Sequence, residues 1–162
     1  MHLTLRALKN DSGKCVGSRE RRKNMEAREI IEQFENNIED DFISYCYNTI
    51  EDIEGMIEPF FAVEPLLLLM ERNPDINYGM SGPIVHFVEK FYGNGYEEML
   101  VDSIKRKPTK HTLWMLNRVI NGSSGEVKKE CLNMLTDITS DTDLCDESIR
   151  NEAQVFLTSH LE

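Results

Sequence analysis

Apolar side chains recur every four residues near the start of the regularly patterned part of the chain. Glutamates lie between them, as on the solvated face of an amphipathic helix. The apolar positions are Ile30, Phe34, Ile38 and Phe42. This spacing predicts one long helix over 26–47. A shorter helical segment over 50–58 is expected to end at Pro59, because proline cannot donate a backbone hydrogen bond.

Proline, glycine and capping residues divide the rest of the chain into further helices. Pro65 suits a helix start, and Thr109 is the expected N-cap of a helix that is apolar around most of its circumference and therefore central. The expected helices lie at 66–72, 83–91 and 110–121, with apolar faces marking three more at 96–104, 127–138 and 149–161. No useful length alternates with period two, so we expect no substantial sheet.

These elements predict an all-α fold. Short helices joined by short polar turns pack as antiparallel hairpins, which gives a compact bundle and a single domain over 25–162. The last two helices share a register at an offset of 22 residues. Val127, Cys131 and Leu135 match Ile149, Ala153 and Leu157. Because this pattern looks like the inner helix of a HEAT-type repeat, we expect the bundle to be HEAT-like.

Charge is distributed unevenly. Residues 1–24 carry seven Lys/Arg and two acids, whereas 25–71 carry thirteen acids and Arg28 alone, within a chain of net charge −11. We interpret 1–24 as a disordered basic tail and hypothesise that translation starts at Met25 in the cell. The alternative is a basic arm for nucleic acid. It is disfavoured because the acidic segment that follows would repel phosphates.

The sequence contains only fragments of catalytic chemistry. No hydrolase, zinc-protease, phosphate-loop or dinucleotide motif is present. His86 lies in an apolar run and is expected to be partly buried, whereas His111 is expected at the surface. The acids of segment 141–146 are expected to cap the last helix rather than to bind calcium. We therefore expect no enzyme activity, no cofactor and no metal.

Cysteine spacing and hydropathy indicate the setting. Cys15, Cys46, Cys131 and Cys145 form no CxxC pair and are expected to be reduced thiols. No apolar run is long enough for a membrane span, and the N-terminus lacks the apolar core of a secretory signal. The expected location is cytoplasmic, without membrane contact, and a monomer is favoured.

Segment 38–58 carries seven carboxylates and no positive charge, with aromatic residues within it and beside it at Phe60 and Phe61. A solvated helix face is one interpretation. The other is a surface for a basic protein, because aromatic anchors ringed by charge of one sign suit a tight interface. The residues then expected to bind the partner are Glu39, Asp40, Asp41, Tyr45, Tyr47, Glu51, Asp52, Glu54 and Glu58.

A family resemblance rests on the residues GPIVHFVEKF (82–91), Tyr96, Leu100, Ser103, KPT (107–109) and HTLWMLNRVIN (111–121). In these residues the chain resembles small helical immunity proteins of bacterial polymorphic-toxin and contact-dependent growth inhibition systems. The resemblance implies a protein that binds the C-terminal catalytic domain of a cognate toxin, frequently a nuclease, and blocks its active site. The shared positions look like core and turn residues, so no toxin-contacting residue is carried over. The alternative function is a helical-repeat adaptor or regulator that has no toxin partner.

Overall fold

A computed structural model describes residues 29–38, 41–79 and 81–160, and this part of the chain is helical without any strand. The all-α prediction is confirmed. A helical segment covers 29–35, and the later elements are α2 (Phe42–Glu54), the 3-10 helix η1 (Pro59–Ala62), α3 (Val63–Arg72), α4 (Pro83–Glu89), α5 (Tyr96–Arg106), α6 (Lys110–Gly122), α7 (Gly125–Ser140) and α8 (Glu147–Ser159). None of the described helices combines the length and apolar character needed to cross a membrane. The predicted tail 1–24 lies outside the described residues.

The single helix predicted over 26–47 is wrong, because the chain turns before α2. Asn37 ends the first helical segment: its side-chain Nδ2 donates to the Gln33 carbonyl at 2.7 Å, and its backbone N–H donates to Phe34 O at 3.1 Å. Asparagine side chains compete in this way with the regular helical ladder. The predicted segment 50–58 is also wrong, since α2 continues through Ile50 to Glu54.

The four-residue apolar spacing instead reflects packing across this turn. The rings of Phe34 and Phe42 meet edge to face with centroids 6.3 Å apart, and both side chains are buried. Ile38 lies partly buried against the same core. The two helical segments therefore share one apolar cluster although they do not form one helix.

Most later helices begin and end within about two residues of the predicted boundaries. Thr109 caps α6 by accepting a hydrogen bond from the Thr112 backbone N–H at 3.2 Å, while the Thr112 hydroxyl accepts one from the Thr109 N–H at 2.9 Å. Asp146 caps α8 by accepting from the Ile149 N–H at 3.0 Å. α3 begins at Val63 rather than after Pro65, which lies in the first turn, where proline needs no donor.

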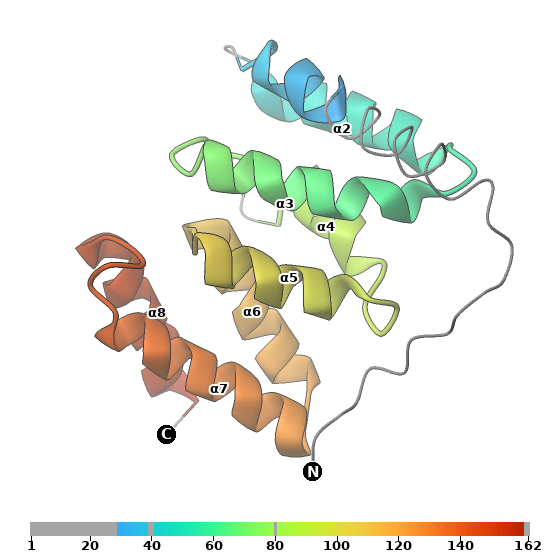
Figure 1. Ribbon diagram of the computed structural model, residues 1–162. Helices are drawn as coiled ribbons and strands as arrows, with labels where there is room; N and C mark the ends of the chain where they lie inside the picture. The colour runs from blue at the N-terminus through green and yellow to red at the C-terminus, as the bar shows by residue number, and fades with distance from the viewer. Residues whose placement is uncertain (1–28, 39–40, 80, 161–162) are drawn as a thin grey trace, which may run out of the picture.

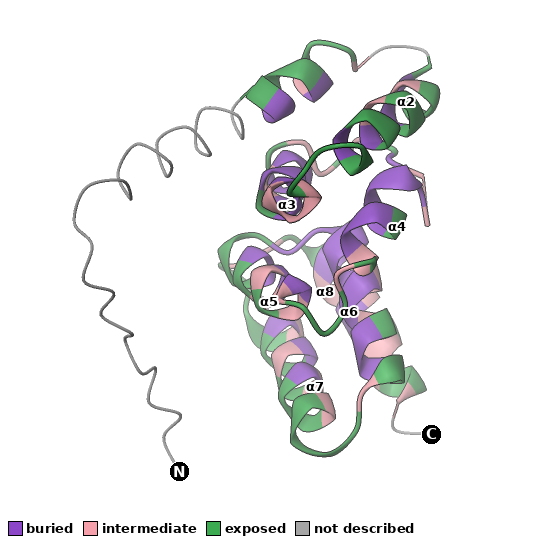
Figure 2. Ribbon diagram, turned by 90° about the vertical axis from the view of Figure 1, so that its right-hand side faces the viewer, coloured by how far each residue is buried: buried purple, intermediate pink, exposed green. Residues whose placement is uncertain are grey.

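The helices form a stack with α2 at one end and the α7–α8 hairpin at the other (Figure 1). α2 packs mainly against α4, α3 packs against α5, and the central α6 packs against α3, α5, α7 and α8. Buried residues line the space between these layers (Figure 2). Pairing of consecutive helices therefore holds in the second half of the chain but less in the first. The HEAT-like description stays a prediction.

Two polar contacts fix α3 within this stack. The buried Tyr78 hydroxyl donates to the carbonyls of Leu69 and Asn73, each at 3.2 Å, at the end of α3. On the neighbouring helix α5, Arg106 donates through Nε and Nη2 to both carboxylate oxygens of Glu71 at 2.8–3.2 Å. Glu71 is only 7% exposed, whereas the Arg106 side chain is partly open to solvent, so this ion pair joins α3 to α5 at the edge of their interface.

Candidate protein-binding surface

The outward face of α2 carries acidic side chains that form no ion pair with any other described residue. Asp41, Glu51 and Asp52 are exposed, and within the described part of the chain none of the three forms an ion pair. Asp41 occupies the N-cap position of α2, but its side chain makes no capping hydrogen bond. These carboxylates therefore contribute to the negative field around α2 without stabilising the fold through a partner.

Large apolar side chains lie exposed beside these acids. Seven large hydrophobic side chains are exposed in the described residues, and four of them fall between positions 43 and 57. They are Ile43 (37% exposed), Tyr47 (56%), Met56 (45%) and Ile57 (101%). Exposed apolar side chains grouped in this way are typical of an interaction site, whereas scattered single ones are not.

Helix geometry places these residues on two flanks of the exposed part of α2, with Asp41 and Asp52 on one flank and Ile43 and Tyr47 on the other. Phe42, Cys46, Ile50 and Ile53 are buried and hold α2 against the core. Ile43, Tyr47 and Glu51 follow one another at intervals of four residues, which places them in one row on the helix surface. The outer side of α2 is accordingly exposed along most of its length (Figure 2). We call Asp41, Ile43, Tyr47, Glu51, Asp52, Met56 and Ile57 the acidic α2 surface.

Several residues predicted for this surface have other roles. Tyr45 is half-buried rather than exposed: its ring meets Phe34 edge to face at 5.7 Å, and its hydroxyl donates to the Gln33 carbonyl at 3.2 Å. Phe60 and Phe61 are likewise half-buried against the core, because η1 turns them inward. Glu54 is paired with Lys90 at the end of α4, so its charge is already compensated.

Three more residues were predicted to bind the partner, and the structure describes one of them, Glu58. Glu58 is exposed, and its backbone carbonyl accepts a hydrogen bond from the Phe61 N–H at 3.2 Å. Glu39 and Asp40 lie outside the described residues. Sequence reasoning missed Ile43, Met56 and Ile57. One available signal was the position of Met56 and Ile57 in a short connection between Gly55 and Pro59, where neither side chain belongs to a helical core face.

The structure reverses both histidine predictions. His86 is exposed because it faces away from the core-forming residues of α4. His111 is buried, and its ring lies edge to face against Tyr78 at a centroid distance of 5.2 Å. Among the described residues its Nδ1 has no hydrogen-bond partner. Burial, together with the nearby Lys110 charge, lowers the pKa of His111 below the usual 6.5. In the described residues no group of three or more His, Cys, Asp or Glu side chains is placed to hold a metal ion.

Cys46, Cys131 and Cys145 are free thiols. Burial raises the pKa of Cys46 to about 12 and also raises those of the other two. A protonated thiol is a poor nucleophile, so the environments of these residues favour structural roles.

The arrangement on α2 combines the two features of a protein-binding surface, charge of one sign and exposed apolar side chains. Unneutralised carboxylates attract a cationic molecule over several ångströms, and the exposed apolar side chains supply contact area once water leaves the interface. No protein-family model, curated protein or solved structure matches this chain.

Proposed function

We propose that this protein is an immunity protein that binds a cognate bacterial toxin domain and neutralises it by covering its active site with the acidic α2 surface. The observation that carries the proposal is the set of carboxylates at Asp41, Glu51 and Asp52, which lack ion pairs within the described residues and stand beside exposed apolar side chains. The resemblance of segments 82–91 and 111–121 to helical immunity proteins supports the same function.

A nuclease is the toxin class that this surface fits best. A nuclease cleft must hold phosphates with Lys and Arg side chains, and a group of surface carboxylates can occupy the same cationic positions. Tyr47 and Ile57 would then fill apolar contacts that a polynucleotide backbone does not use. Opposite charges also speed association, so a newly made toxin domain is captured before it meets its substrate.

The test uses the toxin domain encoded next to the gene, expressed in a bacterial host whose growth it arrests. The native protein should restore growth and bind the purified domain, and binding should slow as salt is raised because salt screens the attraction. The triple variant Asp41→Lys, Glu51→Lys, Asp52→Lys should weaken binding by roughly a hundredfold, because like charges then face each other.

The matched control reverses three exposed acids at the opposite end of the stack: Asp137→Lys, Asp143→Lys and Glu147→Lys. Each set includes one acid at a helix N-terminus, so the effects on helix stability are comparable. The control set should change the dissociation constant by less than about threefold. Equal effects of the two sets, or the absence of a neighbouring toxin domain, would contradict the proposal and favour an adaptor without a toxin.

A second comparison tests the apolar part of the surface. Tyr47→Ala should weaken binding by about thirtyfold if the ring is a buried anchor in the complex. Val155→Ala removes a similarly exposed side chain from α8 (64% exposed against 56% for Tyr47) and should leave the affinity unchanged. If the two variants bind alike, the acidic α2 surface is not the contact.

A further inference from the structure

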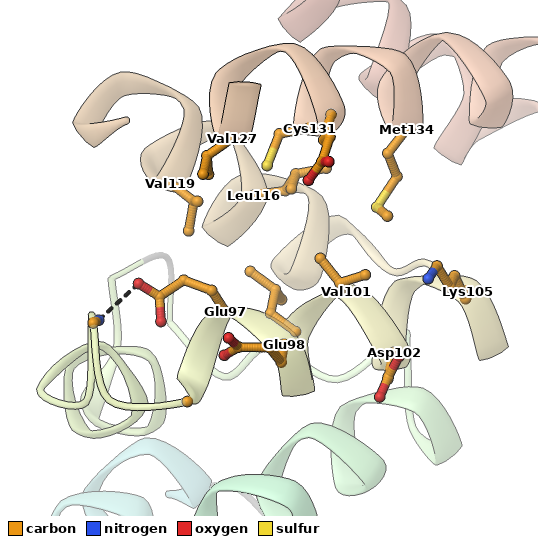
Figure 3. A pocket seen from close by; sticks show the side chains of 14 residues that line it. Glu97, Glu98, Val101, Asp102, Lys105, Leu116, Val119, Val127, Cys131 and Met134 are labelled. Atoms are coloured by element: carbon orange, nitrogen blue, oxygen red, sulfur yellow. Dashed lines mark hydrogen bonds between the residues drawn. The ribbon is translucent and has the colours of Figure 1, made fainter. Parts of the chain in front are cut away.

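A second concave surface lies between α5 and α7. Both helices pack against α6, and between them they leave an open groove of about 770 Å³, which is within the size range of ligand sites. Its floor includes the buried side chains of Leu100, Leu116 and Val119. Figure 3 shows Val101 of α5 pointing toward α6 and α7, with Val127 and Met134 pointing back from α7.

The groove walls are apolar but incompletely covered. Val127 is 52% exposed, whereas Val101 and Met134 are half-buried. An apolar lining that the protein's own helices do not cover is the usual character of a binding groove. The groove lies between α5 and α7, with α3 standing between α5 and α2, so it is a surface separate from the acidic α2 surface (Figure 1).

The rim of the groove is predominantly acidic. Glu97, Glu98 and Asp102 of α5 and Glu130 of α7 line it, against Lys105 as the cation in the lining. The Glu97 carboxylate accepts a hydrogen bond from the Gly93 N–H at 2.7 Å, which holds this charge at one end of the groove (Figure 3). A second copy of the chain is a poor occupant, because each copy carries a net charge of −11.

We propose that the groove between α5 and α7 binds a cationic amphipathic helix of a partner protein. The walls are helices whose backbone groups are already paired internally, so they offer no edge for an extended peptide. A helix satisfies its own backbone hydrogen bonds and can place apolar side chains at positions i, i+3, i+4 and i+7 in the groove. Lys or Arg on its flank would then face the carboxylates of α5.

Synthetic helical peptides of about 15 residues provide the probe. The first has leucines at i, i+3, i+4 and i+7 and lysines on the flanks. The second is a scramble of the same composition, and the third has glutamate in place of lysine. Fluorescence anisotropy should show that the first peptide binds and that the other two bind at least tenfold more weakly, which corresponds to about 1.4 kcal/mol.

Two pairs of variants then locate the binding site. Val127→Ser should weaken binding of the lysine peptide by about tenfold, whereas Val155→Ser, a comparably exposed valine on α8, should not change it. Glu98→Lys should weaken it several-fold, whereas Glu147→Lys, also in the first turn of its helix, should not. Methyl NMR should show shifts at Val101, Val127 and Met134 and none at Ile43 or Ile57.

Three results would overturn the proposal: equal binding of all three peptides, equal effects of Val127→Ser and Val155→Ser, or peptide-induced shifts confined to α2. The first would indicate non-specific binding that depends neither on the charge of the peptide nor on its apolar pattern. The proposal does not depend on the immunity function. The toxin assay uses variants of α2 and the peptide assay uses variants of α5 and α7, so failure of one is distinguishable from failure of the other.

Discussion

Replacing Arg106 with methionine should lower the free energy of unfolding by about 2 kcal/mol. Arg106 donates three hydrogen bonds, at 2.8–3.2 Å, to a Glu71 carboxylate that is only 7% exposed. Breaking a fully buried ion pair costs about 3–5 kcal/mol, because a charge is left without compensation. The Arg106 side chain is 39% exposed, so solvent screening reduces the expected cost to roughly half. Methionine keeps an unbranched apolar stem, which limits the loss of packing.

An exposed ion pair on α7 provides the matched control. The Lys129 Nζ lies 3.8 Å from Glu126 Oε1, and both side chains are largely exposed. Lys129→Met should therefore lower the free energy of unfolding by no more than about 0.5 kcal/mol. The assay is urea denaturation followed by far-UV circular dichroism, with the slope of the transition checked for constancy. A cost for Arg106→Met that equals the cost for Lys129→Met would refute the reasoning.

The double variant Glu71→Met/Arg106→Met separates the ion pair from packing. Replacing both partners removes the uncompensated carboxylate, so the double variant should be more stable than the sum of the two single losses predicts. The expected interaction free energy is about 1–2 kcal/mol. Simple additivity of the two single effects would show that Glu71 and Arg106 are not coupled in the folded protein.

Two further predictions concern the buried imidazole and the helix ends. The pKa of His111 is lowered in the folded state, so below about pH 6.5 the unfolded chain binds a proton more readily than the folded protein does. The contribution of neutral His111 to the free energy of unfolding is therefore complete above about pH 6.5 and decreases as the pH falls below that value. The stability advantage of the native protein over His111→Asn, measured by urea denaturation, should therefore be smaller at about pH 5.5 than at about pH 7.5, and an unchanged difference would contradict this. Thr109→Ala should lower the free energy of unfolding by about 1–2 kcal/mol, because it breaks a reciprocal capping box. Asp146→Ala should lower it by about 1 kcal/mol, because it removes a single capping hydrogen bond. Thermal melts that rank the two variants in the reverse order would count against the capping interpretation.

Helix ends with strong local chemistry were predictable from the sequence. Thr109 and Asp146 cap helices through contacts that span only three residues, and such contacts are visible in a linear pattern. The prediction of one helix over 26–47 was wrong for a different reason. Its four-residue spacing also fits two segments packed across a turn, and the adjacent pair Asn36 and Asn37 was the local signal for that turn.

The candidate surface was predictable in its charge but not in its exposure. Exposure depends on which residue takes the core position: Phe42 is buried, so its neighbour Ile43 is directed outward. The pairing of Glu54 with Lys90 joins residues 36 positions apart, which only the folded chain brings together. His86 and His111 were misplaced because a single polar residue in an apolar run can lie on the outer face, and a residue next to a lysine can lie on the inner one.

The central position of α6 has a consequence for the groove beside it. Leu116 and Val119, which line the groove, come from the helix that packs against α3, α5, α7 and α8. Both side chains are buried, and moving α6 would disturb its packing against four helices, so the concavity is already shaped before any ligand arrives. An incoming helix therefore meets a preorganised receptor, and most of the conformational entropy lost on binding is its own.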